Sequence, residues 1–368
     1  MSGAGEPRCR ARDLGIAPGI FRPGTWNAIT DVAGVRVGQV TVIEGEAVRT
    51  GVTAILPHGG NPYQDRVPAG LSVMNGYGKL AGATQLVELG EIETPIVMTN
   101  TLAVGRAVEA VVDWTLALPG NEAVRSVNAV VGETNDGRLN DIRRRGVTAA
   151  HVLQAITEAA EGPVAEGSVG AGTGTMAFGW KGGIGTSSRL LPPALGGYRV
   201  GVLAQTNFGG ALLADGVPLG RALGKFYLRD HADRGDADGS VMLVVATDAP
   251  LSDRNLTRLA RRAMAGLART GAAFSDGSGD YAIAFSTHPE VRRTPARRQA
   301  AAPILDLPND RISPLFVAVA EATEEAILNS LFMARSVESR DPLTGKRVTG
   351  RAIDLGAVRQ VLVQKGRR

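Results

Sequence analysis

A serine at the junction between a polar segment and an apolar one is the first candidate for chemistry in this chain. Ser240 follows Gly239 at the end of residues 229–239, which contain four aspartates, and precedes an apolar run at residues 241–247. If the bond between Gly239 and Ser240 were cut, Ser240 would carry both a hydroxyl nucleophile and a free α-amine. An α-amine has a pKa of about 7.7–8.0, so it can act as a general base near neutral pH without a histidine. The competing interpretation is an ordinary loop serine in front of a strand.

Two polar residues at alternate positions, Ser278 and Asp280, form the second candidate group. Side chains two positions apart in an extended segment point to the same side. A hydroxyl and a carboxylate placed in this way could orient the amine of Ser240 and stabilise its protonated form. A plain turn rich in Asp and Gly would produce the same pattern.

Two further candidates follow predicted strands. Asn207 lies at the end of a strand expected at residues 198–206, and its amide NH2 could stabilise an oxyanion. Glu133 follows a strand expected at residues 127–131, and its carboxylate could pair with a substrate ammonium. The same two residues are also compatible with a turn-forming asparagine and a solvated loop acid.

Several common motifs are absent or incomplete. The chain has no G-x-S-x-G nucleophile elbow, so His58, Gly59 and Gly60 are interpreted as a turn. It also has no G-x-x-x-x-G-K-[ST] sequence. Residues 181–189 are rich in glycine and could cradle an anion, although a structural glycine-rich loop is the simpler interpretation.

The elements that must position these residues are short strands and helices in mixed order. Further strands are predicted at residues 35–42, 52–56, 95–98, 241–247 and 281–287. Helices are predicted at residues 80–89, 103–118, 151–160, 252–271 and 315–337, with Ser252 as the N-cap of the fourth. Strict alternation of strand and helix is missing, which favours helices packed on sheets in layers. The best candidate for a domain boundary is the polar segment at residues 229–239.

The composition is typical of a globular protein without a disulfide framework. Of 368 residues, 44% are hydrophobic and 21% are charged, which excludes a disordered chain. Cys9 is the single cysteine and the four histidines lie far apart, so we expect neither disulfides nor a metal site. The net charge of +4 is dispersed, which argues against nucleic-acid binding. No apolar run approaches the ~18 residues of a membrane span and no secretory signal is visible, so we expect a cytoplasmic protein without a membrane partner.

The candidate segments occur together in an order that resembles a known family. The chain is similar to the P1 family of self-processing N-terminal-nucleophile aminopeptidases, the L-aminopeptidase/D-esterase (DmpA-like) and β-peptidyl aminopeptidase group. Beyond the candidate residues, the likeness rests on residues 27–35 (NAITDVAGV), 75–78 (NGYG), 178–189 and 239–250 (GSVMLVVATDAP). Several long motifs in family order are more specific than any one of them alone.

The resemblance implies an α+β fold, with residues 1–368 forming a single αββα sandwich similar to that of ornithine acetyltransferase. It implies that the precursor cleaves itself between Gly239 and Ser240 into an α chain of residues 1–239 and a β chain of residues 240–368. It also implies a homo-oligomer, often a tetramer of αβ units, that needs no metal or cofactor.

The resemblance also assigns roles to the candidate residues. Ser240 would be the nucleophile and its α-amine the base, while Ser278 and Asp280 would support that amine. Asn207 would hold the oxyanion, and Glu133 would bind the free amino group of a small peptide, amide or ester. The expected reaction is acyl transfer to water through an acyl-enzyme, on L-, D- or β-amino acid substrates. Two alternatives remain: an acyltransferase of the same fold, and a non-catalytic binding protein that stays one chain.

Overall fold

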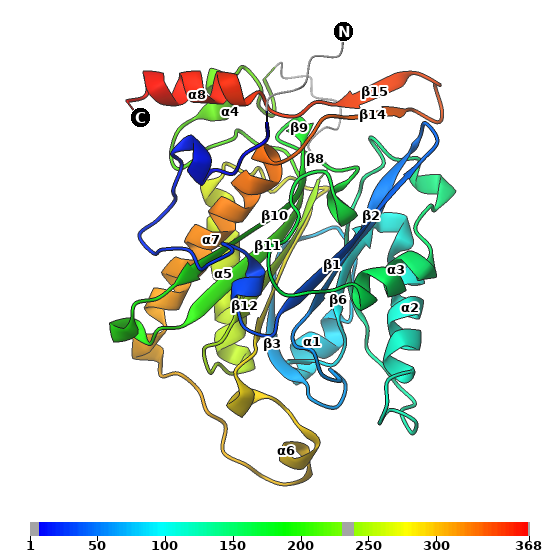
Figure 1. Cartoon of the computed structure of the whole chain (residues 1–368), viewed down its shortest axis with the longest axis vertical. Helices are drawn as coiled ribbons and strands as arrows, with labels where there is room; N and C mark the ends of the chain where they lie inside the picture. The colour runs from blue at the N-terminus through cyan, green and yellow to red at the C-terminus, as the bar shows by residue number, and fades with distance from the viewer. Residues whose placement is uncertain (1–6, 230–238, 367–368) are drawn as a thin grey trace.

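Two β-sheets, each covered on its outer face by helices, make up the body of the molecule (Figure 1). The computed structural model describes residues 7–229 and 239–366. The first sheet has six strands in the order β10 (Gly183–Leu190), β11 (Arg199–Asn207), β12 (Ser240–Thr247), β13 (Gly279–Ser286), β3 (Val67–Gly76) and β5 (Glu91–Ile92). The second has five in the order β1 (Arg36–Glu44), β2 (Val48–Leu56), β6 (Ile96–Asn100), β7 (Val130–Thr134) and β4 (Leu80–Ala81).

Helices cover the two outer faces. The six-stranded sheet packs against α5 (Asp253–Arg269) and α7 (Ser313–Phe332), and the five-stranded sheet against α2 (Val104–Leu116) and α3 (Ala149–Thr157) (Figure 1). The remaining helices are α1 (Ala83–Leu89), α4 (Leu219–Ala222), α6 (Pro295–Gln299) and α8 (Leu355–Gln364). Two small hairpins are formed by β8 (Met176–Ala177) with β9 (Trp180–Lys181), and by β14 (Val337–Arg340) with β15 (Arg347–Gly350).

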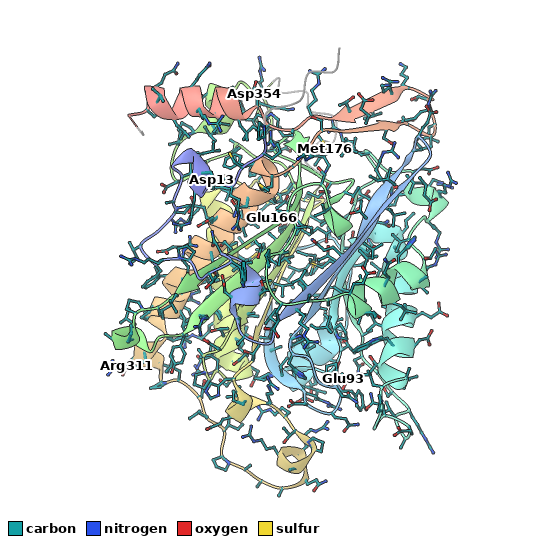
Figure 2. The ribbon with its side chains drawn as sticks, in the orientation of Figure 1. Asp13, Glu93, Glu166, Met176, Arg311 and Asp354 are labelled. Carbon is teal, nitrogen blue, oxygen red and sulfur yellow. The ribbon has the colours of Figure 1, made fainter. Side chains whose placement is uncertain are left out.

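Three apolar cores fill the spaces between these layers, which are packed with side chains (Figure 2). One core joins α5 and α7 to the six-stranded sheet, the second lies between the two sheets, and the third joins α2 and α3 to the five-stranded sheet. A helix or sheet must bury its apolar face against another layer, and four layers need three such cores. The expected αββα sandwich of the α+β class is therefore confirmed.

Strand β12 runs through the middle of the six-stranded sheet and belongs to two of these cores. Val241, Leu243 and Val245 face α5 and α7, whereas Met242 and Val244 face the second sheet. This alternation explains why residues 241–247 are apolar at every position rather than at every second one. The prediction of a strand buried on both faces is correct.

The glycine-rich stretch at residues 181–189 is mostly strand β10, so the interpretation of this stretch as a loop, with or without an anion, is wrong. Its glycines are needed for close packing instead. A Cβ atom on Gly185 would lie 1.9 Å from the carbonyl oxygen of Ala326 in α7, and one on Gly183 would lie 2.1 Å from the carbonyl oxygen of Gly167. Glycine therefore lets the strand approach a helix on one side and a connecting segment on the other.

Several element limits differ from the prediction. Helix α7 ends at Phe332, and the rest of the helix expected to reach residue 337 is an irregular segment that leads into β14 at Val337. Strand β7 begins three residues later than expected, at Val130. Ser252 occupies the N-cap position of α5, but its hydroxyl donates to Asp306 instead of capping the helix. Strands β3, β14 and β15 and helix α8 were not predicted, and residues 230–238 of the expected boundary segment lie outside the described residues.

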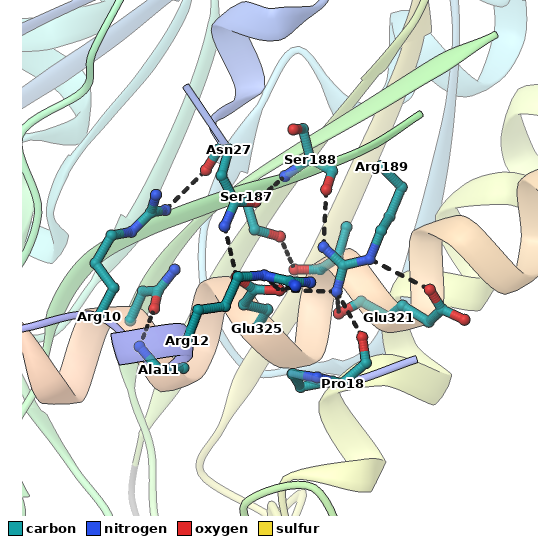
Figure 3. Close-up of polar contacts among 12 residues, drawn as sticks. Arg10, Ala11, Arg12, Pro18, Asn27, Ser187, Ser188, Arg189, Glu321 and Glu325 are labelled. Carbon is teal, nitrogen blue, oxygen red and sulfur yellow. Dashed lines mark hydrogen bonds and ion pairs between the residues drawn. The ribbon is translucent and has the colours of Figure 1, made fainter. Parts of the chain in front are cut away.

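A buried ion cluster joins the N-terminal segment and strand β10 to helix α7 (Figure 3). Arg189 has no solvent exposure and pairs with Glu321 at 3.2 Å and with Glu325 at 2.9 Å. Arg12 also binds Glu325, at 2.9 Å, and the side-chain amide of Asn27 donates to the same carboxylate. All of these contacts connect residues before position 240 with residues after it.

A second ion pair, with a buried carboxylate, lies beside this cluster. Arg10 binds Glu166 at 2.8 Å, and Glu166 also accepts a hydrogen bond from the backbone N–H of Thr186 in β10. Burial raises the pKa of Glu166 to about 7, although the charge of Arg10 opposes that rise. Partly exposed arginines of the N-terminal segment thus bind carboxylates that are almost completely buried.

Candidate active site

Three neighbouring strands bring the candidate residues of the six-stranded sheet side by side. Ser240 is the first residue of β12, where it is paired with Asn207 on β11 and with Gly279 on β13. Strands β12 and β13 are parallel, so the segments that enter them, with Gly239 and Ser278, lie at the same sheet edge. The sheet itself therefore collects three segments that are far apart in the sequence.

The hydroxyl of Ser240 lies against the peptide bond that precedes it. Its Oγ donates a hydrogen bond of 2.7 Å to the carbonyl oxygen of Gly239 and accepts one of 3.3 Å from the backbone N–H of Gly279. The Gly279 N–H also donates to the Gly239 carbonyl oxygen, at 3.2 Å. Attack of Oγ on that carbonyl carbon would close a five-membered ring, and a donor already polarises the carbonyl.

Glycine is required at position 239 by the space around it. A Cβ atom there would lie 2.4 Å from both the carbonyl oxygen of Asn207 and the Cα of Phe208. Real Cβ atoms do not approach backbone atoms so closely, so any other residue would displace the carbonyl that faces Ser240.

Ser278 and Asp280 lie on the same side of their segment, next to Ser240. The hydroxyl of Ser278 donates to Asp280 Oδ1 at 2.6 Å. Asp280 Oδ2 is buried and has no hydrogen-bond partner among the described residues. Burial raises the pKa of Asp280, and the hydrogen bond from Ser278 opposes that rise. A buried carboxylate with an unused oxygen would be stabilised by a cation such as the ammonium of a new N-terminus.

The side chain of Asn207 is fixed at both ends of its amide. Its Oδ1 accepts a hydrogen bond of 2.9 Å from the backbone N–H of Met176, and its Nδ2 donates one of 2.9 Å to the carbonyl oxygen of Asn135. A carboxamide has two N–H groups, so this arrangement leaves one for a further acceptor. Asn207 can therefore donate to an oxyanion without rearranging.

Glu133 comes from the other sheet, where it is buried within β7 rather than solvated in a loop after it. One carboxylate oxygen accepts a hydrogen bond of 3.0 Å from the backbone N–H of Lys79, and the other accepts one from the hydroxyl of Thr101. Gly78 lies so close that a Cβ atom there would come within 3.1 Å of Glu133 Oε1. The carboxylate is thus held in one position and buried, as a binding site for an ammonium requires.

One cavity of about 430 Å³ brings together Ser240, Asn207 and Glu133. Ser278 and Asp280 do not line it, which places them behind the nucleophile rather than in contact with a substrate. Several lining residues were not predicted from the sequence. Those that it did not single out for a role are Tyr77, Gly78, Lys79, Thr101, Asn135, Arg138, Met176, Gly179, Phe208 and Gly277. The motif at residues 75–78 was the only sequence signal for any of the first three.

Two further features concern residues 7–229 and 239–366, the part of the chain that the structure describes. No group of three or more His, Cys, Asp or Glu side chains is arranged to hold a metal ion. Within the same residues, no helix is both long enough and apolar enough to cross a membrane.

Comparisons with known proteins agree on family, fold and class of activity. The model of a family described as peptidase family S58 matches residues 27–344. The chain is 44% identical over 358 residues to the beta-peptidyl aminopeptidase BapA of Sphingosinicella microcystinivorans, covering 91% of this chain and 87% of that protein.

Two solved structures have the same fold over almost their whole length. A beta-aminopeptidase of a Burkholderia species is 42% identical with a TM-score of 0.84, over 98% of this chain and 100% of the other. The L-aminopeptidase D-Ala-esterase/amidase of Ochrobactrum anthropi is 36% identical with a TM-score of 0.85, over 98% and 99%. That enzyme is described as a prototype for the serine aminopeptidases and a variant of the Ntn hydrolase fold.

Proposed function

The chain belongs to peptidase family S58, and from this premise we propose that it cuts its own bond between Gly239 and Ser240 and then uses Ser240 as an N-terminal nucleophile. It is a hydrolase of the aminopeptidase class, as its sequence resemblance predicted. The mature enzyme would consist of residues 1–239 and 240–368 within one αββα domain. A single observation carries the proposal: Ser240, Asn207 and Glu133 line one cavity, and the Ser240 hydroxyl contacts the carbonyl of the bond to be cut.

Maturation would proceed as an N-to-O acyl shift. Ser240 Oγ attacks the carbonyl carbon of Gly239, and collapse of the intermediate breaks the C–N bond and leaves Gly239 esterified to Ser240. The proton of the hydroxyl goes to the amine that is released. Water then hydrolyses the ester, which frees the carboxylate of Gly239, the hydroxyl of Ser240 and its α-amine.

The mature enzyme would repeat this acyl transfer on a substrate. The α-amine of Ser240 takes the proton from Oγ, and Oγ attacks the first carbonyl of the substrate. Asn207 donates its remaining N–H to the oxyanion that develops. The α-ammonium, stabilised by Ser278 and Asp280, gives its proton to the leaving group. Water then attacks the acyl-enzyme, with the amine again acting as base.

Substrate selection would depend on Glu133. Its buried carboxylate pairs with the free amino group of the substrate at a fixed distance from Ser240, so only a terminal residue can be released. We propose small peptides, amides and esters with a free amino terminus as substrates. Because the relatives include beta-peptidyl aminopeptidases, we include β-amino acid residues among those released.

The two chains would remain associated after cleavage. The ion cluster around Glu325 and the two apolar cores that flank the six-stranded sheet join residues on both sides of position 240. We further propose a cytoplasmic homo-oligomer, a tetramer of αβ units, that acts without a cofactor.

Intact mass of the purified protein tests the proposal most directly. Wild-type protein should give two masses that split between Gly239 and Ser240, whereas Ser240→Ala should give one full-length mass and no aminopeptidase activity. Ser187→Ala is the matched control, since Ser187 is another buried strand serine whose hydroxyl donates to a carbonyl oxygen, at 2.6 Å. Cleavage and activity in Ser240→Ala would overturn the proposal.

A further inference from the structure

A buried lysine outside the cavity holds together the segment that orients Asn207. Lys181 has no solvent exposure, and its Nζ donates to the carbonyl oxygens of Gly172, Thr175 and Gly182, each at 2.8 Å. Three acceptors require three N–H groups, which only the ammonium form of lysine has. Residues 172–182 are therefore wrapped around a single buried charge.

Asp136 is also buried, and its negative charge acts on Lys181 although no ion pair or hydrogen bond joins these two described side chains. Burial lowers the pKa of Lys181 to about 7, and the charge of Asp136 opposes that change. Burial likewise raises the pKa of Asp136 to about 7, against its hydrogen bonds and the charge of Lys181. Asp136 also fixes the turn after β7, because Asn140 donates its side-chain amide to Oδ1 at 2.8 Å and the N–H groups of Leu139 and Asn140 donate to its carbonyl oxygen.

The two segments meet at the amide of Asn207. The N–H that binds Asn207 Oδ1 belongs to Met176, the residue after Thr175, whose carbonyl Lys181 holds. The carbonyl that binds Asn207 Nδ2 belongs to Asn135, the residue before Asp136. Both partners of the Asn207 amide are backbone atoms, so their positions depend on the course of the two segments and not on the side chains of Met176 and Asn135. Met176 is the first residue of β8, and its label in Figure 2 lies in the region where Figure 1 labels β8.

We propose that Lys181 and Asp136 are a positioning pair that sets the carboxamide of Asn207 for the oxyanion. The inference rests on the proposed function, in which Ser240 is the nucleophile. Neither residue lines the cavity, so both act through Asn207 and not on the substrate. Oxyanion donors work only about 2.7–3.1 Å from the developing charge. A misplacement of about 1 Å can lower the rate by about a hundredfold.

A double-mutant cycle on the matured enzyme tests this coupling. The variants are Lys181→Met, Asn207→Ala and the combination of both, assayed with a β-alanyl anilide and normalised to the amount of cleaved chain. Lys181→Met should lower kcat by about ten- to a hundredfold with little change in KM, because the oxyanion contact exists only in the transition state. The double variant should be no slower than Asn207→Ala alone. Lys181→Arg, which keeps the charge and the donors, should recover most of the lost kcat.

The control is Glu166→Gln, which alters another buried charge whose partners, Arg10 and Thr186, lie outside both segments. Its kcat should stay near that of the wild type, and its effect should multiply with that of Asn207→Ala. The positioning role is overturned if Lys181→Met keeps wild-type kcat, or if its loss multiplies with that of Asn207→Ala.

Two further arms keep the result interpretable. If Lys181→Met does not fold, the same cycle uses Asp136→Asn, which preserves shape and removes the countercharge. Ser240→Ala distinguishes failure of the proposed function from failure of the positioning role. An active Ser240→Ala overturns the proposed function, whereas an inactive Ser240→Ala together with a multiplicative cycle overturns only the positioning pair.

Discussion

The Ser240 hydroxyl and the Gly239 carbonyl oxygen are 2.7 Å apart, and the space around Gly239 leaves no room for a side chain. This contact places a nucleophile against a peptide bond of its own chain. Ser240 is held there because β12 pairs with β11 on one side and with β13 on the other. Position 239 should therefore control the rate of maturation separately from the chemistry of the mature enzyme.

Gly239→Ala should slow self-cleavage by at least tenfold, because the new methyl group would collide with the backbone at Asn207 and Phe208 and turn the carbonyl away. The measurement is the fraction of cleaved chain against time by intact mass. Gly105→Ala is the control, since a Cβ atom on that residue of α2 meets nothing within 4 Å. Equal cleavage rates for the two variants would show that the tight fit at Gly239 has no role in maturation.

Glu133→Gln should weaken recognition of the substrate amine. A hydrogen bond to a charged group contributes about 2 kcal/mol, which corresponds to about a thirtyfold loss in kcat/KM. The shape of the side chain and its contacts to Lys79 and Thr101 are largely kept, so maturation should proceed. A substrate with an acetylated amino group provides the internal control, because it should be poor for both enzymes and equally so. An identical loss on the acetylated substrate would exclude a role for Glu133 in binding the ammonium.

Much of the fold could be predicted because its signals are local. The apolar run of β12 and the helical spacing of apolar residues in α5 indicate directly which of their residues are buried. The turn residue Gly90 ends α1 where expected. Strand β10 was missed because its glycines are required by contacts with other segments: Gly185 meets α7, more than a hundred residues away in the sequence, and Gly183 meets Gly167. Glycine on a strand has no side chain from which a pattern could be read.

The candidate site was predicted unevenly for a similar reason. Ser278 and Asp280 are two positions apart, so strand geometry alone indicates that they face the same side. The burial of Glu133 and the electrostatic interaction of Lys181 with Asp136 depend on segments that the sheets bring together. No spacing rule in the sequence connects such residues.

Asp280→Asn should move the acid limb of the kcat/KM profile to lower pH. The Ser240 α-amine must be neutral to act as base, so activity falls as the pH drops below its pKa, which for an unperturbed α-amine is about 7.7–8.0. Removing the carboxylate next to the amine disfavours the ammonium form and lowers that pKa. Activity at high pH should fall as well, because proton transfer from Oγ to the amine loses its support. If the acid limb of the kcat/KM profile stays at the same pH, Asp280 does not interact with the amine.

Stability should depend on pH through Glu166. Its pKa is raised from 4.5 to about 7 in the folded chain, so the folded state holds this proton more tightly than the unfolded state. The resulting stabilisation is fully present below about pH 4.5 and is lost as the pH rises through about 7. In Glu166→Gln, the free energy of unfolding in urea should therefore fall less steeply between pH 5 and pH 7 than in the wild type. Parallel curves would contradict the raised pKa.

Glu325→Gln should reveal how the cleaved chains stay together. The carboxylate pairs with Arg189 and Arg12 without solvent exposure, and removing one partner of a buried ion cluster costs about 3–5 kcal/mol. In the uncleaved Ser240→Ala background the two halves are one chain, so the fall in the urea midpoint includes no separation of residues 1–239 from residues 240–368. Any effect of protein concentration in that background reports only the proposed association of subunits.

In the mature enzyme the same substitution acts on a bimolecular equilibrium. Dilution then favours separated chains, so the midpoint of Glu325→Gln should fall further as the protein concentration is reduced. The comparison requires urea unfolding of both backgrounds at two protein concentrations. Circular dichroism follows the loss of structure, and molecular size follows the separation of the chains. If the midpoints of mature and uncleaved proteins shift equally at every concentration, the cluster stabilises the fold but does not hold the two chains to each other.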